Sequence, residues 1–204
     1  MAQEIYLDMI PAEGSYINAG IWTILLEPVV TVTGQYYLYL PAGNGRGDST
    51  GFYRSTPQVT LTVPSTAAKV ITVGAYDPVY DTYADFSGRG YADSTRTIGV
   101  AAAGLTKPDL VAPGVNIQAP DVYGTFTPTT GTSFATPIVS GAAVLLMEWG
   151  IVRGNDPFLY GEKIKAYLRK GARPLRGERE YPNDRVGYGR LCVADSLPQT
   201  GTAE

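Results

Sequence analysis

The sequence predicts an α/β protein with a mostly parallel sheet and a buried helix, preceded by a small antiparallel β segment. Three observations support this fold class. Residues 142–147 form an almost unbroken apolar run that suits a helix buried on most sides. Residues 70–75 and 110–115 are short apolar runs typical of buried strands. Residues 4–40 alternate in polarity between glycine-containing turns, as antiparallel hairpins do.

These patterns divide the chain into two parts. Residues 1–57 form an antiparallel β insertion segment and its loop, and residues 58–204 form the mostly parallel α/β part. In the first part EIYLDMI alternates, IWTILLEPVVTV is rich in β-branched residues, and QYYLYL is an aromatic alternation. Residues 41–57 hold four glycines and two prolines, which disfavours regular structure and predicts a loop.

The composition is that of a globular protein, with 44% hydrophobic and 17% charged residues. A net charge of −3 gives no reason to expect nucleic acid or an anionic membrane as a partner. We expect no membrane span, because Glu148 ends the longest apolar run. The opening MAQEIYLD lacks the basic head and apolar core of a signal peptide.

The cysteine and histidine counts restrict the chemistry of this chain. The single cysteine, Cys192, can form neither an intrachain disulfide nor, by itself, a metal site. No Asp/Asn-rich loop stands out as a calcium site, so we expect no cofactor and leave calcium open. The chain has no histidine. A serine nucleophile needs a base, and in the Ser-His-Asp arrangement that base is histidine.

The strands of the α/β part are separated by loops and a bend. Residues 60–75 predict a short edge strand, a loop and a buried strand. Residues 109–120 predict a β run that bends at Pro113-Gly114. The Thr/Gly-rich residues 122–130 then lead into Gly131 and the helix.

The start of the predicted helix carries the candidate nucleophile. Pro137 is tolerated in a helix only near its start, which places Ser133 at the N-terminus. Free backbone N–H groups and the positive end of the helix dipole lie there and would stabilise negative charge on an attacked carbonyl. The simpler alternative is that Thr132 or Ser133 only caps the helix.

The C-terminal part predicts a second helix and a closing segment. Gly150 is expected to end the first helix. Residues 155–157, Asn-Asp-Pro, predict the cap of an amphipathic helix whose basic residues lie toward its end. Residues 176–185 predict a solvated loop, and GRLCVADSL predicts a short strand and a helical turn.

The segment Gly131–Pro137, Gly-Thr-Ser-Phe-Ala-Thr-Pro, resembles the nucleophile signature Gly-Thr-Ser-x-Ala-x-Pro of the subtilisin-like serine peptidases. Residues 70–75 and 84–90 resemble the strand and loop before that family's second core half, and residues 107–115 resemble its KPD-APG strand. With residues 187–191 the resemblance extends over roughly residues 59–197, in the family's order. It implies that residues 58–204 are the C-terminal half of a subtilisin-like catalytic domain.

The resemblance also implies roles for individual residues. Ser133 would be the nucleophile of an acyl-enzyme mechanism, and its backbone N–H would contribute to the oxyanion hole. Gly131, Thr132 and Pro137 would support the nucleophile turn. Residues 42–45, Ala-Gly-Asn-Gly, are similar to the segment that supplies a side-chain oxyanion donor, so Asn44 is a second candidate. Asn44-Gly45 is also a common turn sequence.

Residues 4–40, with IWTILL, a turn and a tyrosine-rich strand that ends at Leu40-Pro41, resemble the jelly-roll-like insertion of some clostridial members of the family. The implied substrate is a peptide or protein, and the implied compartment is secreted or spore-associated in a bacterium. The catalytic aspartate and histidine would come from outside this chain, in cis or in trans, so the chain alone is expected to be inactive. The alternative is a non-catalytic relative that binds a peptide or protein.

Overall fold

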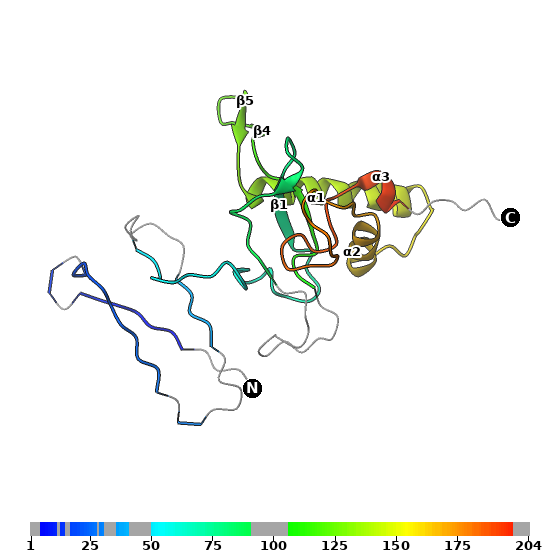
Figure 1. Ribbon diagram of the computed structural model, residues 1–204. Helices are drawn as coiled ribbons and strands as arrows, with labels where there is room; N and C mark the ends of the chain where they lie inside the picture. Colours follow the sequence, from blue (N-terminus) through cyan, green and yellow to red (C-terminus); the bar gives the residue numbers. More distant parts are fainter. Residues whose placement is uncertain are drawn as a thin grey trace. The chain divides into compact units, whose positions relative to one another are not determined.

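The computed structural model describes residues 5–11, 13–14, 17–27, 29–30, 36–40, 50–90 and 106–197. It divides into two units, one of residues 1–53 with 98–100 and one of residues 54–97 with 101–204. Figure 1 shows the elements of the second unit, in which all helices and strands described here lie.

In the first unit, none of the described residues belongs to a helix or a strand. The rings of Tyr37 and Tyr39 lie 6.3 Å apart at an interplanar angle of 23°, as expected for side chains on one face of an extended chain. A strand requires ladder hydrogen bonds to a neighbour, and none joins the described part of residues 5–40. The predicted hairpins are therefore not present there as paired strands, and the boundary at residue 57 stays a prediction.

The second unit is built on a three-stranded sheet of order β2-β1-β3. Strand β1 (Val73–Asp77) runs parallel to β3 (Leu110–Pro113) and antiparallel to β2 (Thr82–Tyr83). The parallel register pairs Val73 with Leu110 and Tyr76 with Pro113. The β3 strand is buried over three of its four residues, as its apolar sequence predicts. The parallel pair, covered by helices, confirms the α/β class.

Helix α1 (Thr132–Met147) packs against β1 and β3. The residues that it buries are spaced three or four apart and line one face: Ala135, Val139, Ala142 and Leu146. On other positions of the helix Val144 and Leu145 remain 62% and 53% exposed. The prediction of a helix buried on most sides is wrong for this chain, because the described strands and helices cover only one face of α1.

The end of α1 also differs from the prediction. The helix continues past Met147 as a π-helical turn, η1 (Glu148–Val152), so Gly150 does not end it. Gly150 is buried, and a Cβ there would lie 2.9 Å from Cδ2 of Leu159 and 3.1 Å from the carbonyl oxygen of Asp156. The glycine is required for close packing of the turn that follows the helix, rather than as a stop signal.

Helix α2 (Gly161–Lys170) is amphipathic, as predicted, and buries Ile164 and Leu168. Its N-cap residue is Tyr160, so the cap predicted at residues 155–157 is wrong. The Asp156 carboxylate instead accepts hydrogen bonds from Lys163 Nζ (2.6 Å) and the Tyr167 hydroxyl (2.8 Å) inside α2. The final short helix is α3 (Val193–Ser196), where a closing helical turn was predicted.

A fully buried carboxylate, Asp109, lies just before β3 and contacts three cations. Lys107 Nζ lies 3.0 Å from Asp109 Oδ2, and Lys165 Nζ lies 3.1 Å from Oδ1. Arg169 Nε donates to Oδ1 at 2.8 Å. Both lysines also donate to the Val70 carbonyl oxygen, at 2.8 and 2.9 Å. These bonds join the loop before β1, the start of β3 and α2.

Burial lowers the pKa of Lys107 to about 8, although the adjacent Asp109 carboxylate acts in the opposite direction. Lys107 and Asp109 are the two fully buried charged side chains of this cluster. The cluster therefore couples stability to pH.

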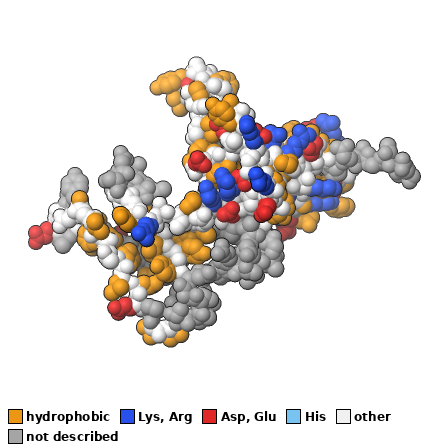
Figure 2. Space-filling model, in the orientation of Figure 1, with side chains coloured by type: hydrophobic (Ala, Val, Ile, Leu, Met, Phe, Trp, Pro, Cys, Tyr) orange, Lys and Arg blue, Asp and Glu red, His pale blue; other side chains and the backbone are white. Residues whose placement is uncertain are grey.

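Between β3 and α1 the chain forms a hairpin of β4 (Ile117–Pro120) and β5 (Phe126–Thr129). The hairpin stands away from the sheet and helices of its unit (Figure 1). At its tip, the Asp121 carboxylate accepts bonds from the Tyr123 and Thr125 N–H groups at 2.9 and 3.0 Å. Figure 2 shows hydrophobic side chains on this projecting hairpin, where Val122 and Tyr123 are almost fully exposed.

One segment is long and apolar enough to cross a membrane by length and composition, residues Thr132–Val152. The prediction that no run reaches this length is therefore wrong, because η1 extends α1 past Glu148. Core helices of soluble proteins meet the same two criteria. In this chain one face of α1 packs on β1 and β3, as in a core helix.

Candidate active site

Ser133 lies in the first turn of α1, where the sequence predicted it, and its side chain is exposed. Among the described residues, its hydroxyl has no hydrogen-bond partner. The neighbouring hydroxyls differ, because Thr136 Oγ1 donates to the Thr132 carbonyl oxygen at 2.9 Å and Ser140 Oγ donates to that of Thr136 at 3.2 Å. Ser133 is therefore a solvent-accessible hydroxyl at a helix N-terminus.

The N-cap of α1 is Gly131, and no side chain caps the helix. The alternative that Thr132 or Ser133 serves only as a cap is thereby excluded. Gly131 has φ 154° and ψ 158°, a region that residues with a Cβ rarely adopt. In the first turn, the N–H of Phe134 donates to the Gly131 carbonyl oxygen at 3.1 Å, whereas the N–H groups of Thr132 and Ser133 have no intrahelical acceptor. No acidic residue lies in that turn. An anionic oxygen near Ser133 would therefore meet backbone donors and the positive end of the dipole.

Pro137 lies in the second turn of α1, one turn later than the sequence reasoning assumed. A proline there removes the N–H that would bond to the carbonyl four residues earlier, which is that of Ser133. Pro137 is exposed. The first turn of α1 thus has one fewer backbone hydrogen bond to the second turn. The position of Ser133 therefore depends more strongly on the segment that precedes it.

The turn is held to the sheet through Gly114, which sequence reasoning treated only as a bend. Gly114 N donates to the Tyr76 carbonyl of β1 at 3.0 Å, and its own carbonyl accepts from Gly131 N at 2.8 Å. A Cβ at Gly114 would lie 2.6 Å from Cβ of Ala75 and 3.1 Å from the Gly131 oxygen. Only glycine lets the three backbones meet this closely.

A second link lies beside the first. Asn116 N donates to Thr130 Oγ1 at 3.0 Å, and Thr129 Oγ1 donates to the Ile117 carbonyl at 2.8 Å. Asn116 has φ 54°, a left-handed conformation that asparagine tolerates better than most residues. We call residues 114–117 and 129–131 the hairpin base, because these bonds close the hairpin where it meets the sheet and α1.

The sequence bears on two further site features, a histidine base and a second oxyanion donor. The chain has no histidine, so the base cannot be an imidazole of this chain. Asn44, the second oxyanion candidate, lies outside the described residues and stays a prediction. Within the described ranges, no group of three or more Cys, Asp or Glu residues is placed to hold a metal ion.

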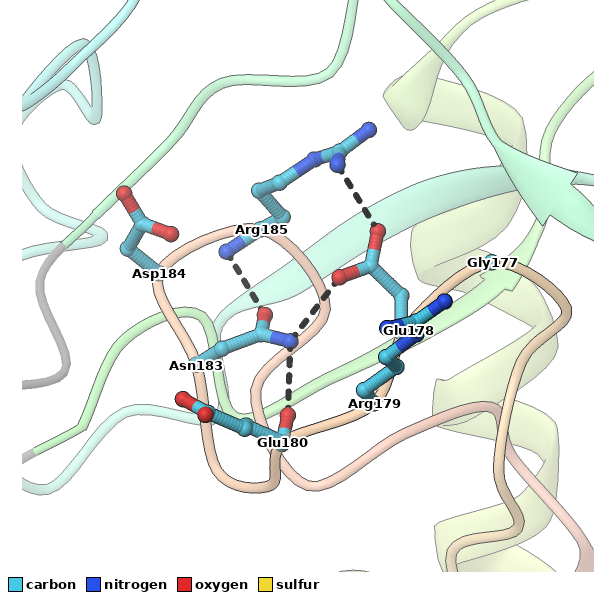
Figure 3. A pocket seen from close by; sticks show the side chains of 7 residues that line it. All are labelled: Gly177, Glu178, Arg179, Glu180, Asn183, Asp184 and Arg185. Carbon is cyan, nitrogen blue, oxygen red and sulfur yellow. Dashed lines mark hydrogen bonds and ion pairs between the residues drawn. The ribbon is translucent and has the colours of Figure 1, made fainter.

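A polar cavity of about 300 Å³ lies on the loop of residues 177–185 (Figure 3). Asn183 Nδ2 donates to Glu178 Oε2 at 3.1 Å and to the Glu180 carbonyl at 2.9 Å, while the Arg185 guanidinium pairs with Glu178 at 3.0 Å. The Nε of Arg185 is buried without a hydrogen-bond partner among the described residues. None of the residues that line the cavity is a predicted site residue. The loop predicted to be solvated is thus cross-linked by its own side chains.

Comparison with known proteins identifies the family. The sequence model of the subtilase family, peptidase family S8, matches residues 35–189. The serine protease AprX of Bacillus subtilis is 32% identical over 159 residues, which cover 68% of this chain and 32% of AprX. The membrane-bound transcription factor site-1 protease of Mus musculus is 38% identical over 132 residues, or 65% of this chain and 12% of that protein.

Solved structures agree with the sequence comparison. The CspB protease of Clostridium perfringens is 44% identical with a TM-score of 0.64, covering 72% of this chain and 29% of CspB. The prenylagaramide maturation protease PagA is 32% identical with a TM-score of 0.53, covering 69% of this chain and 46% of PagA. The chain thus spans about a third of the length of AprX and of CspB. With the nucleophile signature at the start of α1, these matches place the chain in the subtilase family of serine peptidases.

Proposed function

We propose that this chain is the serine-bearing part of a subtilisin-like endopeptidase, which hydrolyses peptide bonds through an acyl-enzyme on Ser133. The observation that carries the proposal is the exposed Ser133 hydroxyl in the first turn of α1, beside N–H groups that no side chain caps. Family membership supports the reaction class.

The proposed reaction proceeds in two steps. A base removes the Ser133 hydroxyl proton while Oγ attacks the carbonyl carbon of the scissile bond, giving a tetrahedral intermediate. Backbone N–H groups of the first turn, Ser133 N among them, stabilise the negative oxygen. The protonated base then gives its proton to the departing amine, which leaves Ser133 acylated. The same base then takes a proton from a water molecule, whose oxygen attacks the acyl carbonyl carbon. The base returns that proton to Ser133 Oγ as the C–Oγ bond breaks and the carboxylic acid product leaves.

The base and its orienting aspartate are proposed to come from a segment outside this chain, in cis or in trans. The chain has no histidine to act as that base. The exposed side of α1 supports the same proposal. Val144, Leu145 and Met147 are 62%, 53% and 42% exposed, which is unusual for three apolar residues on the central helix of a domain. A segment that covers this face would complete the core and bring the catalytic groups to Ser133.

Labelling with a fluorophosphonate tests the proposal, because the probe reacts with activated serines. The 204-residue chain alone is expected to show no labelling, since an unassisted serine is a poor nucleophile. The coding sequence upstream of Met1 is first searched for an aspartate followed by a Gly-His pair. A longer polypeptide that includes this upstream segment is expected to label at Ser133. The control is Ser133→Ala, which removes only the hydroxyl.

Two outcomes would contradict this function. Rapid stoichiometric labelling of the chain alone would show that it has a base of its own. Failure of the longer polypeptide to label, with its Asp and His present and the fold intact, would favour the non-catalytic alternative, a relative that binds a peptide or protein without cleaving it.

A further inference from the structure

We propose that Thr130 is a positioning residue for the nucleophile turn, acting through the hydrogen bond between its hydroxyl oxygen and the backbone N–H of Asn116. This inference rests on the proposed function of Ser133. It concerns a residue that lies three positions before the nucleophile and contacts no predicted catalytic group.

A long stretch of chain separates the sheet from Ser133. From Gly114 the chain leaves the sheet, forms the β4–β5 hairpin and returns at Gly131. The hairpin projects from its unit and carries exposed Val122 and Phe126 at its outer end (Figure 1). Motion at the tip of this hairpin would displace the nucleophile turn unless the hairpin base is held in place.

Apart from the β4–β5 ladder, which starts at the Ile117–Thr129 pair, few bonds close the hairpin base. They are Gly131 N to the Gly114 oxygen, Asn116 N to Thr130 Oγ1, and Thr129 Oγ1 to the Ile117 oxygen. The bond from Asn116 N to Thr130 Oγ1 depends on a side chain, and Thr130 directly precedes Gly131. It also holds Asn116 at φ 54°, where the chain turns sharply from the sheet into β4.

Helix α1 alone cannot hold the nucleophile turn in place. Pro137 removes the helical bond that would reach the Ser133 carbonyl, and Gly131 is in a conformation open to few residues. Ser133 is thus positioned chiefly from its N-terminal side. A displacement of about 1 Å at a nucleophile can lower a rate about a hundredfold.

The experiment compares Thr130→Val with Thr130→Ser in the complete protease. Valine has the shape of threonine but no acceptor, whereas serine keeps the hydroxyl. We expect Thr130→Val to lower kcat per titratable serine about tenfold to a hundredfold, with a smaller change in KM. Thr130→Ser is expected to restore most of kcat. The matched control is Thr125→Val at the hairpin tip, which loses the bond to Asp121 Oδ2 and is expected to leave kcat unchanged.

A second measurement addresses the bond itself in the 204-residue chain. Amide hydrogen exchange at Asn116 is expected to be slow in the natural sequence and in Thr130→Ser, and fast in Thr130→Val. Unchanged kcat in Thr130→Val with a lowered Tm would overturn the inference and leave Thr130 a stabilising residue only. Fast exchange at Asn116 in the natural sequence would also overturn it. If the unaltered complete protease fails to label at Ser133, the proposed function fails first and this inference fails with it.

Discussion

The backbone N–H of Gly131 donates a 2.8 Å hydrogen bond to the carbonyl oxygen of Gly114, which joins the residue before the nucleophile turn to the end of β3. Gly114 also donates to Tyr76 in β1. These two backbone bonds link the candidate nucleophile to the central strands of the sheet. Substitutions that disturb these close contacts should affect both stability and activity.

The first prediction concerns Gly114→Ala. The new Cβ would lie 2.6 Å from Cβ of buried Ala75, so we expect a loss of stability of about 1 to 3 kcal/mol from overpacking. Adding Ala75→Gly removes the opposing methyl group and should recover part of the loss. Urea unfolding of the single and double variants measures both effects. Gly141→Ala, on α1 with nothing within 4 Å, is the control and should raise stability by about 0.5 to 1 kcal/mol. Equal effects at the two glycines would contradict the packing argument.

The second prediction concerns Asp109→Asn. Removal of the carboxylate leaves three cations without their shared partner in the interior, and breaking a buried pair of this kind costs about 3 to 5 kcal/mol. Asp195→Asn is the matched control, because its partner Arg173 is half exposed and such surface pairs contribute about 0 to 1 kcal/mol. Free energies of unfolding at pH 7 compare the two. A small effect at Asp109 would mean that water reaches the cluster.

The third prediction concerns pH. Burial lowers the pKa of Lys107 to about 8, below its ordinary value of 10.5. Between these two pH values the unfolded chain binds more protons than the folded one, so this group makes stability rise with pH there. Below about pH 8 the lysine is charged in both states and the full penalty of burying it remains. In Lys107→Met this rise should be absent.

The measurement is chemical denaturation of both proteins from pH 7 to 10.5, taken as a difference so that other titrating groups cancel. The groups that face Lys107 are Asp109, Lys165 and Thr72, and all are unchanged in the variant. A difference that stays constant with pH would show that Lys107 titrates at the same pH in the folded and unfolded states.

The fourth prediction concerns the two faces of α1. Leu146→Ala removes a fully buried side chain and should destabilise the chain by about 2 to 5 kcal/mol. Val144→Lys alters a position that is 62% exposed and should change stability by less than about 0.5 kcal/mol. In the complete protease, however, Val144→Lys should prevent activity, because the charge would lie where the covering segment packs. Full activity of that variant would show that this face stays exposed.

The sequence was most informative where glycine and proline mark the ends of helices and strands. The order of residues 131–137 located Ser133 at a helix start, and the structure has α1 begin at Thr132. The break at Pro113-Gly114 likewise correctly separated β3 from β4. At these positions the signal is a glycine or proline whose backbone conformation is set by the residue itself.

Features that depend on contacts between distant residues were not predictable from local pattern. Gly150 reads as a stop signal, but its role is set by Leu159 packing against it. Asp156 reads as a helix cap, yet it binds Lys163 and Tyr167. The hairpin was missed as well, although an aspartate at position 121 followed by Gly124, with φ 77°, is a turn signal within residues 121–125.

The buried carboxylate of Asp109 has a consequence for how the chain is made. Arg169, one of its partners, lies 60 residues further along, on α2. During translation β3 leaves the ribosome long before that arginine and Lys165 do, so Asp109 then has only Lys107 of its three cationic partners. A carboxylate with incomplete pairing opposes burial, and we expect β3 to reach its buried position only after α2 has emerged.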